Sequence, residues 1–214
     1  MNITILCSSE THPINAHLVR WIEHNAAEHD ITIARHVQQL LGGDLLFLIS
    51  CNEIVAASIL RQYKKSLVIH ASDLPQGRGW SPHVWQILEG KSLIKVTLLE
   101  AADKVDSGDI WHQVDCEIPR SATWDEINHA LFEAELELMD YAATHFDTCR
   151  PRKQDPTVAP TYYERRRPSD SEIDPTLSIE AQFDRIRVAD PVRFPAFFRL
   201  HGATYRIHLE RIDS

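Results

Sequence analysis

The hydrophobic residues of the chain cluster in short runs that polar, turn-forming segments separate. The runs are rich in Val, Ile and Leu, which is typical of strands that are covered on both faces. Leu18, Val19 and Ile22 instead recur at helical spacing and predict an amphipathic helix after the first strand. Together these elements favour an α/β, Rossmann-like fold with a central, largely parallel sheet. The predicted strands are residues 2–7, 30–37, 45–50, 67–70, 94–99 and 115–119.

A second helix is predicted after the last of these strands. Thr123 and Glu126 have the spacing of a capping box, in which each side chain satisfies a backbone N–H of the first turn. Apolar residues follow at helical spacing, so we expect this helix to pack on the sheet with its glutamates in solvent. The apolar residues are Ile127, Leu131, Ala134 and Leu138, and the glutamates are Glu133, Glu135 and Glu137.

The composition changes at about residue 150. Four prolines between residues 151 and 168 exclude a continuous helix and predict an extended arm that crosses the body. A helix over 178–187 and a β-hairpin built from 197–200 and 204–209 are predicted to follow. We therefore expect a body over residues 1–150 and a C-terminal arm, helix and β-hairpin over residues 151–214.

Polar side chains leave two of the predicted strands, and open α/β sheets bind their ligands at such strand ends. His70 ends the strand over 67–70, while Asp103, Asp106 and Asp109 follow the strand over 94–99. Imidazole titrates near neutral pH, and a nearby carboxylate favours its charged form. The two groups together suit acid–base chemistry. By chemistry alone, all three carboxylates remain candidates.

Four blocks in this part of the chain resemble a known family in their order and spacing. They are HASDLP at 70–75, RGWSP at 78–82, VT at 96–97 and DSGD at 106–109. These blocks resemble the core of the formyltransferases that use N10-formyltetrahydrofolate. That family includes methionyl-tRNA, glycinamide ribonucleotide and sugar-nucleotide N-formyltransferases. The similarity covers residues 47–113, and the tail of the chain resembles that of the sugar-nucleotide enzymes.

The resemblance implies roles for particular residues. His70 would be the central acid–base group and oxyanion partner, and Asp106, the aspartate before Ser-Gly, would orient it. The implied pterin pocket includes Cys51, Asn52, Ile54, Ala102, Asp103, Lys104 and Val105, and the implied acceptor contacts are Ser72, Arg78, Gly79 and Trp80. Two alternatives stay open: residues 50–55 as a plain strand-to-helix turn, and Trp80 as the core anchor of its loop.

One position departs from the family pattern. Most members have an Asn two residues before the histidine, whose amide helps to hold the formyl oxygen, and here that position is Val68. Loss of one such donor typically lowers the rate by about a hundredfold or more. Asn52 or backbone N–H groups can take its place, and we expect Val68 to be a trait of a branch that acts on amino sugars.

The charge of the chain bears on the acceptor. The formal net charge is -9 and no run of Lys and Arg forms a stripe, so no nucleic-acid partner is expected. With the resemblance, this favours N-formylation of a nucleotide-linked amino sugar with N10-formyltetrahydrofolate as donor. The arginines at 165–167 either bind the diphosphate of a nucleotide-linked sugar or neutralise nearby acidic side chains. The alternatives are a methionyl-tRNA or glycinamide ribonucleotide formyltransferase, and a catalytically weak folate- or nucleotide-binding module.

Further expectations concern location, membranes and metals. The four cysteines are scattered without a C-x-x-C pair, which predicts reduced thiols in a cytoplasmic protein. Neither a secretion signal nor an apolar run of membrane-spanning length is evident, so no membrane partner is expected. His12, His17, His24 and His29 recur around the first helix, but no carboxylate or thiol completes a set, so no metal is expected. A homodimer is compatible with the sequence.

Overall fold

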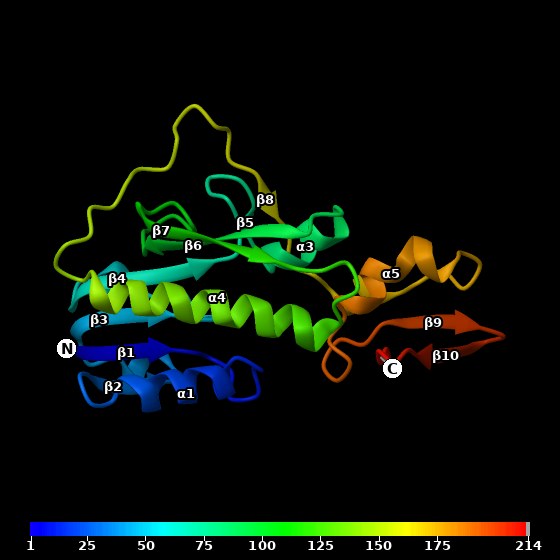
Figure 1. Ribbon diagram of the computed structural model, residues 1–214, viewed down its shortest axis with the longest axis horizontal. Helices are drawn as coiled ribbons and strands as arrows, with labels where there is room; N and C mark the ends of the chain where they lie inside the picture. The colour runs from blue at the N-terminus through cyan, green and yellow to red at the C-terminus, as the bar shows by residue number, and fades with distance from the viewer. Residues whose placement is uncertain (213–214) are drawn as a thin grey trace.

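A six-stranded sheet forms the centre of the computed structural model, which describes residues 1–212 (Figure 1). The first four strands in chain order are parallel, and the last two run antiparallel to their neighbours. The spatial order is β2-β1-β3-β4-β6-β7. The expected fold class, α/β with a largely parallel sheet, is therefore confirmed. The strands are β1 (Asn2–Leu6), β2 (Asp30–Ala34), β3 (Gly43–Leu48), β4 (Tyr63–His70), β6 (Leu93–Glu100) and β7 (Ile110–Glu117).

Two helices, α1 (Asn15–Asn25) and α4 (Trp124–Thr144), pack into one hydrophobic core with the sheet. Leu18 of α1 and Leu138 of α4 are fully buried in that core. The capping box of Thr123 and Glu126 starts α4 as predicted. A smaller core around Leu46 and Tyr63 includes side chains from η1 (Val37–Gln39) and α2 (Ala57–Leu60).

Three local predictions need correction. Strand β7 begins at Ile110, five residues before the predicted start at residue 115, because its first residues pair with the end of β6. Val19 is 48% exposed, since α1 turns Leu18 and Trp21 toward the sheet instead. Glu135 is partly buried and not solvated, because it is eight residues from buried Ile127 and four from Leu131, on the face of α4 that packs on the sheet.

The C-terminal segments return to the body before they form a small core of their own. The chain leaves α4, pairs by backbone at Arg152 with Ile110, and adds β8 (Tyr162–Tyr163) beside β5 (Arg78–Gly79). A core around Ile173 and Ile186 follows. The remaining elements are α3 (Pro82–Leu88), η2 (Pro168–Ser171), α5 (Ile179–Arg187), β9 (Phe197–Leu200) and β10 (Ala203–Arg206).

Figure 1 shows α5, β9 and β10 gathered at the end of the molecule toward which β1, β3 and β4 point. The predicted arm, helix and hairpin are thus all present, and the division at residue 150 stays a prediction. Among the helices of residues 1–212, none combines the length and the apolar character needed to cross a lipid bilayer.

Candidate functional site

His70 is the last residue of β4, and its side chain is 8% exposed. Its Nε2 lies 2.8 Å from the carbonyl oxygen of Gly77. Because a carbonyl can only accept, Nε2 carries the hydrogen of this bond, which sets the orientation of the ring. Nδ1 then faces Asp106, whose Oδ2 lies 3.6 Å away. The structure therefore brings together the imidazole and the carboxylate that the sequence singled out.

Asp106 is held in place by its own loop. Its φ of 53° lies in the left-handed region, and its side chain is 8% exposed. Oδ2 accepts a hydrogen bond of 2.9 Å from the backbone N–H of Gly79. The same oxygen is the one that lies nearest to His70 Nδ1. Two residues on, a Cβ at Gly108 would lie 1.8 Å from the carbonyl oxygen of Glu100. Only glycine allows this loop to pack so closely on the end of β6.

The arm closes the site from a distant part of the sequence. Gly79 has a φ of 100°, and a Cβ there would lie 2.4 Å from the carbonyl oxygen of Tyr163. Gln154 donates to the backbone oxygens of Asp106 (2.8 Å) and Gly108 (3.0 Å). The buried Arg78 guanidinium donates to Gln154 Oε1 at 2.6 Å. Gln154 thus links the Asp106 loop to the loop after β4, and no motif in the sequence marks it.

The acceptor residues implied by the resemblance differ in exposure. Ser72 is 1% exposed, and its carbonyl accepts a hydrogen bond of 2.7 Å from Thr97 Oγ1. Arg78 is also buried, and its guanidinium donates a hydrogen bond to the Tyr162 hydroxyl of the arm instead of facing an open surface. Trp80 is 41% exposed, and the Arg165 guanidinium lies 4.7 Å from the centre of its ring. Of these side chains, Trp80 is the one open to a ligand.

The two segments implied for the pterin are largely open to solvent. Ile54 is 93% exposed, and the backbone N–H of Asn52 donates to Ser8 Oγ at 3.1 Å. Cys51 Sγ lies 3.3 Å from the carbonyl oxygen of Glu53. In the second segment, the residues at 102–105 are exposed, and they lead directly into Asp106. Their accessible main chain suits a flat ligand that needs fixed donors and acceptors.

The departure at Val68 has a structural counterpart. Val68 packs with Leu74, Leu99 and Ile110 in a small apolar cluster beside β4. Its side chain lies two residues before His70 on the same strand, so it points to the same face of the sheet. The position of the usual amide is therefore apolar, and it offers no side-chain hydrogen-bond donor.

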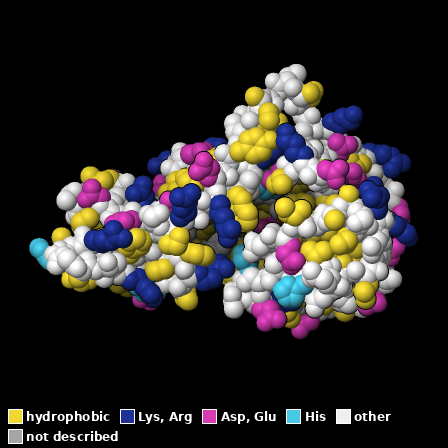
Figure 2. Space-filling model, turned by 180° about the vertical axis from the view of Figure 1, so that it is seen from behind, with side chains coloured by type: hydrophobic (Ala, Val, Ile, Leu, Met, Phe, Trp, Pro, Cys, Tyr) yellow, Lys and Arg dark blue, Asp and Glu magenta, His cyan; other side chains and the backbone are white. Residues whose placement is uncertain are grey.

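Two further histidines bear on the charge near this strand end. Burial lowers the pKa of His83 to about 4, and positive charge on His12, His70 and Arg166 adds to the effect. Burial likewise lowers the pKa of His12 to about 4, with Arg193 adding to the shift and Asp190 opposing it. Both rings are therefore neutral near pH 7. Figure 2 shows Lys, Arg and hydrophobic side chains around a hollow between the body and the C-terminal segments, with His at its edge.

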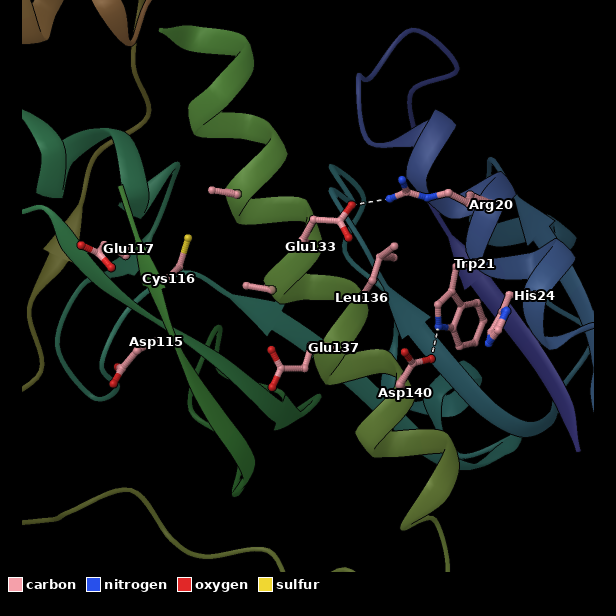
Figure 3. A pocket seen from close by; sticks show the side chains of 12 residues that line it. Arg20, Trp21, His24, Asp115, Cys116, Glu117, Glu133, Leu136, Glu137 and Asp140 are labelled. Atoms are coloured by element: carbon pink, nitrogen blue, oxygen red, sulfur yellow. Dashed lines mark hydrogen bonds and ion pairs between the residues drawn. The ribbon is translucent and has the colours of Figure 1, made fainter. Parts of the chain in front are cut away.

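A cavity of about 680 Å³ lies elsewhere, along α4 between α1 and β7 (Figure 3). None of its lining residues belongs to the His70 site. Many of them are acidic, and Glu133 is paired with Arg20 at one end, while Trp21 Nε1 donates to Asp140 at 2.6 Å. The lining includes Asp115, Cys116, Glu117, Glu133, Glu137 and Asp140.

The model of the formyl transferase family matches residues 6–142. This range includes the last residue of β1 and all of β2, β3, β4, β6 and β7. The chain belongs to the formyl transferase family. This family uses N10-formyltetrahydrofolate as formyl donor, and membership supports an enzyme that transfers formyl groups.

The chain is similar to curated proteins named methionyl-tRNA formyltransferase. Methionyl-tRNA formyltransferase of Protochlamydia amoebophila is 27% identical over 174 residues, which are 78% of this chain and 54% of that protein. The chain spans about a third to a half of the length of the first curated relatives it matches.

Solved structures share the fold. A methionyl-tRNA formyltransferase from Clostridium thermocellum has a TM-score of 0.83 at 23% identity, with 100% of this chain and 94% of that chain covered. A 4-N formyltransferase from Francisella tularensis has a TM-score of 0.76 at 17% identity, with 100% and 98% covered. HypX from Aquifex aeolicus in complex with tetrahydrofolic acid has a TM-score of 0.79 at 20% identity, with 94% and 36% covered.

Proposed function

We propose that the protein transfers the formyl group of N10-formyltetrahydrofolate to the amino group of a nucleotide-linked amino sugar. The observation that carries the reaction class is the enclosed pair of His70 and Asp106 at the end of β4. The Gly77 carbonyl accepts a hydrogen bond from His70, and the Gly79 N–H donates one to Asp106, so the backbone orients both side chains. The donor follows from the use of N10-formyltetrahydrofolate in the family.

The proposed chemistry is an acyl transfer between two nitrogens. A neutral amine attacks the formyl carbon, the new C–N bond forms, and the carbonyl oxygen becomes an oxyanion. The proton of the amine moves to the His70 imidazole, which later returns a proton to the departing N10 as the old C–N bond breaks. Since the Gly77 carbonyl occupies Nε2–H, we assign the transferred proton to Nδ1. Asp106 stabilises the charged imidazolium and keeps the ring oriented.

The oxyanion needs at least one hydrogen-bond donor. Val68 offers none, so we propose that the Nδ1–H of the protonated His70 imidazole, the N–H that the Gly77 carbonyl does not occupy, is the main partner of the oxyanion. Asn52 is exposed at the end of the segment after β3, and its amide is the side-chain candidate for a second donor. Backbone N–H groups of the same segment are the alternative.

The acceptor class rests on charge and on one exposed aromatic. The net charge of -9 disfavours a long nucleic-acid partner but allows a small phosphorylated one at a local cationic site. Trp80 and Arg165 form a stacked pair one residue after Gly79, whose N–H holds Asp106. An indole face and a guanidinium suit a nucleobase and a diphosphate. The similarity in fold to a sugar N-formyltransferase from Shewanella sp. FDAARGOS_354, over 99% of that chain, supports this choice.

Methionyl-tRNA is the second candidate acceptor. It is favoured by the names of the curated relatives and by the structural similarity to the Clostridium enzyme. Both candidates use the same donor and the same proposed catalytic pair, so the acceptor alone separates them.

The test measures release of tetrahydrofolate from N10-formyltetrahydrofolate with separate acceptors. UDP- and dTDP-linked amino sugars are compared with methionyl-tRNA and glycinamide ribonucleotide. We expect turnover with an amino sugar that is lost in His70→Ala and kept in His208→Ala, a change at an exposed histidine near the C-terminus. Formylation of methionyl-tRNA alone would overturn the acceptor, and no turnover with any acceptor would overturn the proposed activity.

A further inference from the structure

Two helices that are far apart in the sequence bring three metal-ligating side chains together. His17 on α1 faces His129 and Glu133, which lie one turn apart on α4. His17 Nε2 lies 3.3 Å from His129 Nδ1 and 3.6 Å from Glu133 Oε1, and His129 Nδ1 lies 3.9 Å from the same oxygen. This cluster lies outside the His70 site.

The three distances have the geometry of a metal site. A point equidistant from the three atoms lies about 2.1 Å from each, which matches the usual lengths of zinc–imidazole and zinc–carboxylate bonds. We propose that His17, His129 and Glu133 bind a divalent transition metal of the Zn²⁺ class, with a fourth position left to water. Without a metal, the two rings share a hydrogen bond and Glu133 Oε1 pairs with the Arg20 guanidinium.

The surroundings of the cluster favour a cation. Glu133 also lines the cavity of Figure 3, and four more carboxylates stand on its walls against one arginine. The other carboxylates are Asp115, Glu117, Glu137 and Asp140.

Arg20 is the competing cation. Its guanidinium pairs with Glu133 Oε1, the oxygen that the metal would use. The Arg20 side chain is 57% exposed, so it can turn into solvent at little cost when a metal binds. Metal binding and the Arg20–Glu133 pair therefore exclude each other at this oxygen, and removal of Arg20 should strengthen the site.

A bound metal would join α1 to α4 across 112 residues of sequence. Anything that binds the folded state but not the unfolded chain stabilises the protein in proportion to the logarithm of its concentration. The proposed site is therefore a clamp between two helices that cover the same core, and its effect is on stability rather than on the formyl transfer.

The experiment uses the full, untagged chain after dialysis against a chelator. Zn²⁺ binding is measured by calorimetry, and the melting temperature is followed with and without Zn²⁺. We expect saturable binding of one ion and a higher melting temperature. His129→Ala should weaken binding by about 100-fold or more, since even loss of groups behind a ligand costs about 10- to 100-fold. His129 is exposed, so this variant should fold normally.

Two further variants make the result specific. Arg20→Gln should bind Zn²⁺ more tightly than the wild type, and His24→Ala, an exposed histidine on the same helix, should bind like the wild type. Absence of saturable binding in the wild type would overturn the proposal. Equal affinity of the wild type and His129→Ala would also overturn it, because the ion would then sit elsewhere.

Discussion

The molecule holds two groups in which imidazole and carboxylate meet, and they are built in different ways. The His70–Asp106 pair sits at the end of a central strand, with both side chains 8% exposed and each bonded to the backbone of the same loop. The cluster of His17, His129 and Glu133 lies between two helices, where the latter two side chains are 64% and 47% exposed.

The difference in burial and in backbone contacts suits the His70–Asp106 pair to proton transfer and the three-residue cluster to ion binding. A buried ring whose orientation the backbone sets can move a proton at one position, and it does so without reorganisation of solvent. Exposed ligand side chains that no backbone hydrogen bond fixes can move apart and close around an ion, and water screens their charges. The same residue types therefore predict different functions once burial and partners are known.

The largest expected effect is a contrast between two histidines. His70→Ala should lower kcat/KM for the formyl transfer by about 1000-fold, since positioned acid–base groups typically contribute 10²- to 10⁴-fold. His129→Ala, which removes an imidazole 3.9 Å from a carboxylate, should leave kcat/KM within about twofold of the wild type, because exposed side chains away from the site contribute little. Steady-state kinetics with saturating donor measure both. Similar losses in the two variants would break the distinction.

A smaller effect is expected from the residue that ties the arm to the site. Gln154→Ala removes both donors to the Asp106 loop and the acceptor of the buried Arg78. We expect kcat/KM to fall about tenfold and the free energy of unfolding to fall by about 1–3 kcal/mol, because Arg78 loses a partner. Gln154→Glu keeps that acceptor but not the donors, so it should restore stability more than kcat/KM. Recovery of both in parallel would argue against a positioning role.

The smallest effect concerns a third carboxylate, two residues from Glu133 on the inner side of α4. Burial raises the pKa of Glu135 to about 8 from its usual 4.5. A raised pKa means that the folded state binds the proton more tightly, so stability falls as the pH rises from about 4.5 to about 8. A pKa change from 4.5 to about 8 corresponds to about 5 kcal/mol. Because Glu135 is only partly buried, solvent screening reduces the effect, and Glu135→Gln should gain on the order of 2 kcal/mol over the wild type above pH 8.

Urea unfolding at several pH values measures this gain. The wild type and Glu135→Gln should be equally stable near pH 4, where the carboxyl is protonated in both states. Glu137→Gln, at an exposed position of the same helix, is the matched control and should show no comparable gain. A constant difference between wild type and Glu135→Gln across the pH range would contradict the role of burial.

The sequence predicted the strands of the central sheet and its two long helices, and the resemblance to the formyltransferases predicted the central pair of the site. Runs of apolar residues marked the strands of the sheet, because burial on both faces leaves a local pattern. The motifs around His70 and Asp106 indicated which carboxylate belongs with the imidazole, and the structure places them 3.6 Å apart. Their roles in catalysis remain predictions.

Tertiary structure alone decided what depends on packing between distant segments. Gln154 reaches a loop 48 residues earlier, and His129 meets a ring 112 residues earlier, distances at which periodicity carries no information. No metal was predicted because the four histidines recur around the first helix with no carboxylate or thiol to complete a set. The carboxylate comes from α4, whose crossing over α1 is set by the shape of their shared core. Glu135 was misplaced for a different reason: its spacing from Ile127 and Leu131 already put it on the predicted apolar face of the helix, and its charge was given more weight than that spacing.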